Sequence, residues 1–232
     1  METPKRALVV TPHPDDAEFG CGGTVARWVR EGAEVYYTLC TNGDKGSNDP
    51  TMTPQRLAQL REREQRDAAA VLGVKRVVML RYPDGELEDT REFRLQLVVL
   101  IRRFKPDVVF CPDPFRRTFY LHRDHRICGQ VTLDAVFPYA RDRLHFPELL
   151  REGLHPHRVA TMLLWGSEDP DTYIDITGLM ETKVKALLCH RSQVSQRPDR
   201  DADAFLRQWA HEAGRKIGAQ YAEAFRRVEF RR

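Results

Sequence analysis

Metal-ligating side chains follow the first apolar run of this chain. Residues 7–11 read Ala-Leu-Val-Val-Thr, and His13-Pro14-Asp15-Asp16 comes shortly after them. Open α/β sheets form their binding crevices outside the carboxyl ends of the strands, and an imidazole and two carboxylates stand at that point here. Adjacent carboxylates repel each other, and a bound divalent cation is the usual way in which proteins reduce that repulsion. We therefore interpret this segment as half of a catalytic metal site.

A second cluster of metal-ligating residues is His122-Arg123-Asp124-His125, beyond the fourth predicted strand and at the start of a predicted helix. A lone histidine is more often structural than a ligand, but two histidines three residues apart, facing the first cluster, favour a shared site. Two histidines and one carboxylate leave a fourth position open for water, which is typical of catalytic zinc. The two clusters together therefore predict a catalytic centre.

The elements that must position both clusters alternate between short apolar runs and longer helical patterns. Strands are predicted at residues 7–11, 34–40, 76–80, 107–111 and 160–165. Helices are predicted at residues 22–31, 54–72, 91–104, 125–137, 179–190 and 204–226, the last with an interruption at Gly214 as the alternative. Alternation of this kind predicts a Rossmann-like, three-layer α/β/α fold with a mostly parallel sheet. Both clusters would then lie at one edge of that sheet.

The glycines after the first cluster raise an alternative, a dinucleotide-binding domain. Gly20-x-Gly22-Gly23 has neither the spacing nor the position of the Gly-x-Gly-x-x-Gly fingerprint, which follows the strand directly. Asp15 and Asp16 occupy that turn and would repel a phosphate. No acidic residue that could bind a ribose ends the second predicted strand. We therefore do not expect a dinucleotide site.

Size and charge limit the classes of protein that the chain can belong to. Its 232 residues are enough for a substantial core, and we predict a single domain, 1–232. The net charge of +3, from 37 basic and 34 acidic residues, is too balanced to predict nucleic-acid binding. The basic residues at the C-terminal end, Arg226, Arg227, Arg231 and Arg232, are interpreted as part of a charged final helix.

Cysteine usage and the N-terminal segment indicate the compartment. The five cysteines include no Cys-x-x-Cys pair, so free thiols in a reducing compartment are expected. The N-terminal segment offers neither a signal peptide nor a membrane span. These features predict a cytoplasmic protein.

Four motifs match one known family. They are His13-Pro14-Asp15-Asp16 with Glu18 and Gly22-Gly23-Thr24, His122-x-Asp124-His125, Arg61-x-x-Glu64 leading to Leu72-Gly73, and His190-x-Ser192-Gln193. Together they resemble the LmbE/PIG-L family of zinc-dependent N-acetylglucosaminyl deacetylases, and the resemblance runs through most of the chain. Pro12 stands where the family commonly has alanine, which should affect only the exit of the strand.

The resemblance implies a metal centre and a base. His13, Asp16 and His125 would hold the metal, since the family's ligands fall on the first and fourth residues of its first motif and the last residue of its second. Asp15 would be free to act as general base and take a proton from the water that attacks an amide carbonyl. The ligand set implies Zn²⁺, with another divalent ion such as Fe²⁺ as the alternative.

The remaining candidate residues would act on the reaction intermediate and the substrate. His122 would stabilise the oxyanion or protonate the leaving amine, with Asp124 holding its ring nitrogen and favouring its charged form. Tyr120 could donate a further hydrogen bond to the oxyanion. Arg61 and Asn42 are candidate substrate-binding residues, with a solvent-facing position in a charged helix as the alternative for Arg61.

Two further segments have less specific interpretations. Asp84-Gly85, after Tyr82-Pro83, reads first as a turn. The motif at 190–193 would either line the pocket or cap the helix that ends there.

The activity implied by the resemblance is removal of an N-acetyl group from a small-molecule N-acetylated amino-sugar conjugate, one that contains N-acetylglucosamine. A soluble conjugate is favoured over a lipid because no membrane segment is predicted. Two alternatives stay open: a metal-dependent hydrolase of a different amide or ester, and a non-catalytic metal-binding member of the fold. Soluble members are frequently homo-oligomers, but no residue pattern here establishes one.

Overall fold

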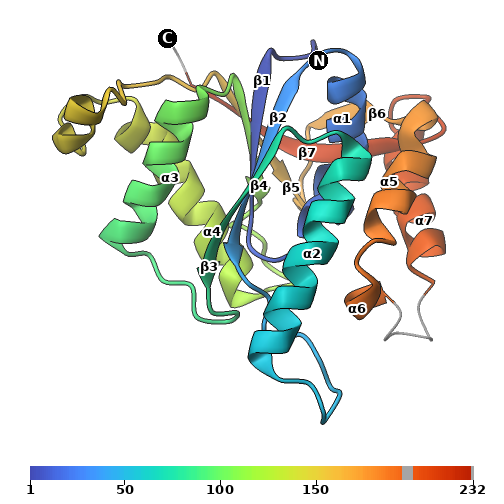
Figure 1. Ribbon diagram of the computed structural model, residues 1–232. Helices are drawn as coiled ribbons and strands as arrows, with labels where there is room; N and C mark the ends of the chain where they lie inside the picture. Colours follow the sequence, from blue (N-terminus) through green and yellow to red (C-terminus); the bar gives the residue numbers. More distant parts are fainter. Residues whose placement is uncertain (195–200, 231–232) are drawn as a thin grey trace.

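The computed structural model describes residues 1–194 and 201–230, which form a central sheet covered by helices (Figure 1). The strands are β1 Arg6–Thr11, β2 Glu34–Thr41, β3 Arg76–Tyr82, β4 Val108–Pro112, β5 Thr161–Trp165, β6 Thr172–Asp175 and β7 Ala222–Glu229. Their order is β3-β2-β1-β4-β5-β7-β6. The strands from β1 to β5 pair in parallel, whereas β7 is antiparallel to β5 and β6. The predicted α/β fold with a mostly parallel sheet is confirmed.

Helices cover both faces of the sheet. The α-helices are α1 Asp16–Arg30, α2 Pro54–Leu72, α3 Arg91–Phe104, α4 Arg123–Asp134, α5 Met180–Leu187, α6 Arg191–Val194 and α7 Ala202–Arg215. Shorter helical segments span Ala135–Ala140, Pro147–Glu152 and Thr177–Leu179. Figure 1 shows α3 and α4 on one face and α1, α2, α5 and α7 on the other, which is the predicted three-layer arrangement.

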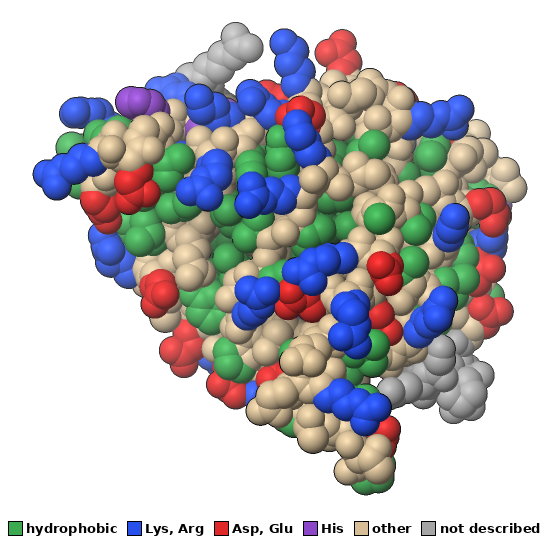
Figure 2. Space-filling model, in the orientation of Figure 1, with side chains coloured by type: hydrophobic (Ala, Val, Ile, Leu, Met, Phe, Trp, Pro, Cys, Tyr) green, Lys and Arg blue, Asp and Glu red, His purple; other side chains and the backbone are tan. Residues whose placement is uncertain are grey.

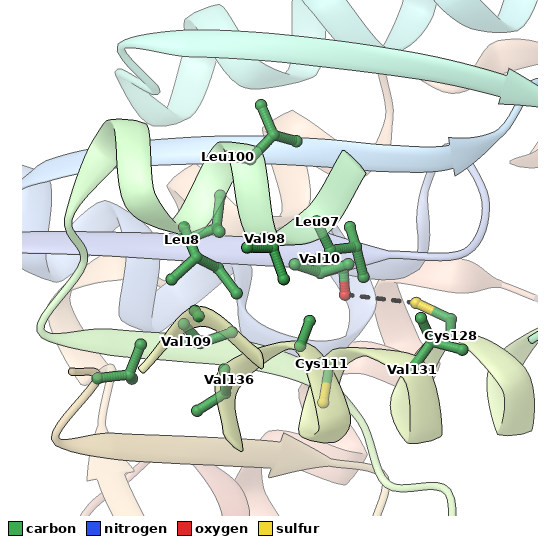
Figure 3. Packing of buried hydrophobic residues seen from close by; sticks show 14 of the residues in the cluster. Leu8, Val10, Leu97, Val98, Leu100, Val109, Cys111, Cys128, Val131 and Val136 are labelled. Atoms are coloured by element: carbon green, nitrogen blue, oxygen red, sulfur yellow. Dashed lines mark hydrogen bonds between the residues drawn. The ribbon is translucent and has the colours of Figure 1, made fainter. Parts of the chain in front are cut away.

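The central strand β1 has apolar neighbours on both faces. Its residues 7–10 are fully buried, which explains a continuous apolar run in place of an alternating pattern. Leu8 and Val10 belong to the core under α3 and α4, together with Leu97 (Figure 3). Ala7 and Val9 belong to the core under α1. Packing on both faces fixes the point at which the chain leaves β1 and enters the first cluster.

Helices α2 and α3 begin and end where the sequence predicts. The Thr53 side chain accepts the backbone N–H of Arg56 at the start of α2, and Gly73 ends this helix with a φ of 75°. The Thr90 side chain accepts the N–H of Phe93 at the start of α3. Local capping signals therefore account for both helices.

Helix α1 begins six residues before the predicted start at residue 22. Two of its glycines allow other elements to approach the helix closely. A Cβ atom at Gly20 would lie 2.5 Å from the ring of Trp165, and one at Gly23 would lie 2.6 Å from Ile176. These glycines therefore belong inside the helix, where they make room for tertiary contacts.

The C-terminal region differs from the helix predicted over 204–226. Helix α7 ends at Arg215, and Gly218, with a φ of 70°, lies in the turn that leads into β7. Pairing with β5 and β6 then holds β7 in the sheet. Arg226 and Arg227 belong to this strand, so the prediction of a charged final helix is wrong for them. Residues 231–232 lie outside the described residues.

Charged side chains of both signs are interspersed over the face of the molecule shown in Figure 2. This agrees with the nearly equal totals of 37 basic and 34 acidic residues. That face therefore carries no extended field of one sign. Among residues 1–194 and 201–230, no helix is long and apolar enough to cross a membrane.

Candidate active site

The two predicted clusters meet at the carboxyl edge of the sheet. Because β1 pairs in parallel with β4, the segments that follow these strands leave the sheet at the same edge. Asp16 Oδ2 lies 3.0 Å from His13 Nδ1 and 3.2 Å from His125 Nε2. The ligand atoms of these three side chains all lie within 4.8 Å of one another. The structure thus brings together the two histidines and one carboxylate that the sequence singles out.

The chemistry of this set fits a divalent metal ion. The side chains of His13, Asp16 and His125 are 8%, 12% and 4% exposed. Among the described residues, neither buried ring nitrogen of His125 makes a hydrogen bond of good geometry: Nδ1 has no partner, and Nε2 has only the 3.2 Å contact with Asp16 Oδ2. A buried polar atom without a partner costs about 1–3 kcal/mol, and coordination through one nitrogen would remove such a cost. Imidazole and carboxylate ligands suit zinc and also iron.

A second group of metal-ligating side chains lies on the other side of the His13 ring. It comprises His13, Asp84, His122 and Asp124. His13 Nε2 is 3.0 Å from Asp124 Oδ2 and 3.1 Å from Asp84 Oδ1. The Asp124 carboxylate also accepts the backbone N–H groups of residues 85 and 87, so its lone pairs are largely used. This favours the Nδ1 side of His13 for a metal, with Asp124 orienting the ring from behind.

The structure corrects the contact expected between Asp124 and His122. The Asp124 carboxylate contacts His13 and not the His122 ring. Because His122 is the N-cap residue of α4, its Nδ1 instead accepts the backbone N–H of Asp124 over 3.1 Å. Burial lowers the pKa of His122, and the nearby His13 and His125 lower it further. The neutral ring is therefore favoured, in place of the expected charged form, and it carries its proton on Nε2.

The ligand side chains polarise one another. Burial disfavours a charged imidazole at His13, but hydrogen bonds to Asp124, Asp16 and Asp84 raise its pKa well above the usual 6.5. Burial also disfavours an ionised Asp16, but the contacts with His125 and His13 hold its pKa well below 3.8. A metal ion at His13 Nδ1 would therefore compete with a proton for that nitrogen.

Asp15 stands beside this set in a different environment. Its φ of 94° lies in the left-handed region, which residues other than glycine adopt only where surrounding contacts hold them there. Gln65 Oε1 accepts the backbone N–H of Asp15 over 3.2 Å. Burial raises the pKa of Asp15 to about 6, with Arg61 acting to lower it and the neighbouring Asp16 to raise it. A carboxylate with such a pKa suits a general base near neutral pH.

Arg61 is buried against the first cluster. Its residue exposure is 4%, so the solvent-facing alternative is wrong. The guanidinium donates to the carbonyl oxygens of Pro14 and Gly43 over 2.6 and 3.0 Å, and its Nη2 lies 3.3 Å from Asp15 Oδ2. A Cβ atom at Gly43, which has a φ of 64°, would lie 2.5 Å from the guanidinium. The loop after β2 therefore closes directly on Arg61.

The next turn of α2 joins the first motif to the motif at 190–193. Gln65 Nε2 donates to Glu18 over 3.0 Å, and the other carboxylate oxygen of Glu18 lies 3.1 Å from His190 Nε2. Glu64 accepts the backbone N–H and the hydroxyl of Ser192 over 2.8 and 2.6 Å. These buried contacts tie α1, α2 and the segment after α5 into one network that supports the site.

A cavity of about 730 Å³ opens over the metal-binding set. Asp15, Asp16 and His125 line it, together with Tyr120 and Gln193. The ring of Tyr120 packs edge-on against His125, with a centroid distance of 4.9 Å. The predicted base, two of the three predicted ligands and the predicted tyrosine therefore share one space that a small substrate can enter.

The structure does not bring Asn42 into this cavity. Asn42 lines a separate cleft of about 350 Å³, together with Glu62 and Arg81. Its side-chain oxygen accepts the backbone N–H of Asp44 over 3.2 Å and so closes the turn after β2. This local bond directs Asn42 away from the metal-binding set.

Sequence reasoning missed three other residues at the site. Asp84, interpreted as part of a turn, contacts His13; its position just after the parallel strand β3 was a usable signal. Gln65 lies four residues after Arg61 and so shares its helix face. Arg116 lines the cavity and donates to the carbonyl oxygen of residue 165 over 3.1 Å, and no pattern in the sequence marks it.

The fold and the site together define a class of protein. A parallel sheet carries two histidines and one carboxylate at its carboxyl edge, with Asp15 as a separate carboxylate beside them. That combination is typical of metal-dependent hydrolases. The chain belongs to the PIG-L family, since the model of this family, described as GlcNAc-PI de-N-acetylase, matches residues 8–136. The resemblance drawn from the motifs is confirmed.

Several similar proteins are named as deacetylases. The chain is 34% identical over 224 residues to a diacetylchitobiose deacetylase of Thermococcus kodakarensis, covering 97% of this chain and 83% of that one. It is 27% identical over 245 residues to a 1D-myo-inositol 2-acetamido-2-deoxy-alpha-D-glucopyranoside deacetylase of Thermomonospora curvata, covering 83% and 82%. The solved N,N'-diacetylchitobiose deacetylase of Pyrococcus horikoshii matches with a TM-score of 0.92 and 36% identity, covering 97% and 84%. These relatives confirm the expected class, a hydrolase acting on N-acetyl amides.

Proposed function

We propose that this protein is a metal-dependent deacetylase that removes the acetyl group from an N-acetylglucosamine unit of a small-molecule conjugate. The observation that carries the proposal is that Asp15 lines one cavity with Asp16 and His125, two members of the buried set that His13 completes. Similarity to deacetylases of diacetylchitobiose and of an acetamido-glucopyranoside supports an acetamido sugar as the substrate.

His13, Asp16 and His125 would hold the metal, which we propose to be Zn²⁺, with Fe²⁺ as the alternative. When bound, a divalent ion polarises the amide carbonyl and lowers the pKa of water to about 7. Asp124 supports the set by accepting a hydrogen bond from His13 Nε2 over 3.0 Å.

Asp15 would take the proton of the attacking water. Its pKa of about 6 leaves it ionised at neutral pH but still basic enough to accept a proton. Arg61 Nη2 contacts Oδ2, so Oδ1 is the oxygen that would hold the proton and pass it to the leaving amine. Arg61 acts in this proposal by positioning Asp15, in place of the substrate-binding role expected from the sequence.

His122 and Tyr120 would stabilise the oxyanion. The lowered pKa of His122 favours the neutral ring, and its Nε2–H is a hydrogen-bond donor. This supports oxyanion stabilisation over protonation of the leaving amine, which would need the charged ring. Tyr120 lines the cavity with Asp15 and His125, and its hydroxyl would donate a second hydrogen bond.

The compartment and the assembly state stay proposals. All five cysteines are free thiols, which supports a reducing compartment such as the cytoplasm. The single domain over 1–232 and a homo-oligomer stay predictions from the sequence and from the resemblance.

Acetate release from a panel of acetylated compounds tests the proposed activity. The panel contains N-acetylglucosamine, the malate and inositol conjugates of N-acetylglucosamine, and N,N'-diacetylchitobiose. It also contains an N-acetyl amino acid and an acetate ester. We expect chelator-sensitive release from at least one amino sugar and none from the last two compounds. Release only from the N-acetyl amino acid or the ester would assign the site to a different hydrolase. No release by metal-loaded protein would favour a non-catalytic metal-binding role.

A further inference from the structure

Helix α7 presents two aromatic side chains that its packing does not use. Leu206 and Ala210 are buried in the apolar cluster shared with α5. Phe205 and Trp209, one turn apart on another face, are 51% and 37% exposed. Their ring centroids lie 6.0 Å apart with an angle of 38° between the planes. Large exposed aromatic side chains that form a contiguous surface commonly mark a binding site.

These aromatic side chains line the cavity that contains the base. Phe205 and Trp209 share the 730 Å³ cavity with Asp15 and His125. Phe119, which is 54% exposed, lines the same cavity from the loop between β4 and α4. The volume lies in the upper part of the range for small-ligand sites, so the cavity extends beyond a single acetamido sugar at the metal-binding set.

We propose that Phe205 and Trp209 form a second subsite, which binds a neutral pyranose ring joined to the reacting N-acetylglucosamine. This inference rests on the proposed function and narrows its substrate class to saccharides of at least two rings. A pyranose with equatorial substituents exposes C–H groups on both faces, and these carry a slight positive charge. The faces of aromatic rings are negative, so the two surfaces attract.

The polar side chains near this platform favour a sugar over other attached groups. Gln208 lines the cavity from the same helix; its Nε2 donates to Glu212 over 3.1 Å, and its amide oxygen can accept hydrogen bonds from ring hydroxyls. Asp201, at the start of α7, places a carboxylate in the lining and disfavours an anionic group there. Asp201 Oδ1 already accepts the backbone N–H groups of residues 203 and 204, but an acyl chain would offer no donor to the second carboxylate oxygen or to the Gln208 amide oxygen.

Calorimetric titration with two sugars tests the subsite. N-acetylglucosamine and N,N'-diacetylchitobiose are titrated into metal-loaded protein that carries Asp15→Asn to prevent turnover. We expect the disaccharide to bind more tightly, and Trp209→Ala to lower the ratio of the two affinities by about 10-fold or more, since burial of an aromatic side chain accounts for such a factor. Phe205→Ala should act in the same direction.

A matched control and a second measurement make the outcome decisive. Phe115 is 54% exposed but does not line the cavity, so Phe115→Ala should leave the ratio unchanged. An unchanged ratio in Trp209→Ala, or an equal loss of affinity for both sugars, would overturn the subsite. Tighter binding of an N-acetylglucosamine with an octyl chain, lost in Trp209→Ala, would assign the platform to an acyl chain and also overturn it. A change in the molecular mass of Trp209→Ala in solution, with an unchanged ratio of the two sugar affinities, would assign Trp209 to a subunit interface.

Failure of the proposed function gives a different result. Wild-type protein that binds the disaccharide with the expected dependence on Trp209, but releases no amine, contradicts the deacetylase and supports the subsite. Wild-type protein that deacetylates both sugars with no dependence on Trp209 supports the deacetylase and contradicts the subsite.

Discussion

At the scale of single residues, the site depends on the different surroundings of two adjacent carboxylates. Asp16 points to His13 and His125, whereas Asp15 lies against Arg61. The left-handed backbone of Asp15, with a φ of 94°, separates the two side chains. Their residue types predict a metal ligand and a base. The backbone conformation that points the two side chains in different directions is held by contacts of Asp15 with Gln65 and Arg61 of α2.

The first prediction concerns Asp15. Asp15→Asn keeps the size of the side chain but removes the group that accepts a proton, so kcat should fall by about 10²- to 10⁴-fold. Metal content by mass spectrometry should stay near that of the wild type, because the proposed ligands do not include Asp15. The exposed Asp169, which pairs with Arg117, offers a control, and Asp169→Asn should change neither quantity. Loss of metal in Asp15→Asn would make Asp15 a ligand.

The second prediction separates the two groups of ligands around His13. His125→Ala should lose both the metal and the activity. His122→Asn preserves a capping side chain for α4 and should keep the metal, while kcat falls by about 10- to 10³-fold through loss of an oxyanion donor. Retention of the metal by His125→Ala, with its loss in His122→Asn, would place the metal with Asp84 and Asp124 instead.

The orientations of some side chains at the site depend on the local backbone, which residue types do not reveal. His122 caps α4, so its ring faces the backbone N–H of Asp124, and the Asp124 carboxylate contacts His13 instead. Asn42 is drawn into a local turn and lines a different cleft. Both outcomes arise from hydrogen bonds with nearby backbone groups, which compete with the functional roles expected from the sequence.

At the scale of elements, the local sequence of α2 predicts where the helix begins and ends but not which of its polar side chains are buried. Its boundaries are marked by Thr53 and Gly73, and the prediction is correct to the residue. Its buried polar face is not visible in the same way, because a charged run such as the one around Arg61 usually faces solvent. Only the network with α1 and the segment after α5 explains why Glu64 and Gln65 are buried.

The third prediction concerns His190, which joins the segment after α5 to α1. His190 and Glu18 pair with both side chains fully buried. Burial disfavours the charged ring, but the hydrogen bond and the charge of Glu18 raise the pKa of His190 above 6.5. The folded protein therefore holds this proton more tightly than the unfolded chain, and the resulting stabilisation is complete below pH 6.5 and lost as the pH rises through the raised pKa.

Urea unfolding of wild type and His190→Gln at several pH values measures this effect. The difference in free energy of unfolding between the two proteins should be largest at the lowest pH and should shrink as the pH rises above 6.5. A difference that is constant over this range would show that His190 stabilises the fold by packing alone.

At the scale of the whole molecule, the alternation of strands and helices predicts the parallel part of the sheet and the common edge of both clusters. The final strand β7 is the main failure. Its start, Ala-Glu-Ala, has high helix propensity and continues the pattern of α7. Pairing with β5 and β6 overrides that propensity. Such a long-range contact leaves no mark in a local window of sequence.

The fourth prediction concerns the dependence of the whole enzyme on its metal. Acetate release from N,N'-diacetylchitobiose is measured on chelator-treated protein as zinc is returned in steps. We predict no release without metal, a linear rise as zinc is added, and a plateau near one zinc per chain, which the ligand set of His13, Asp16 and His125 requires. Full activity of the metal-free protein, or no release from any acetamido sugar at saturating zinc or iron, would contradict a metal-dependent deacetylase.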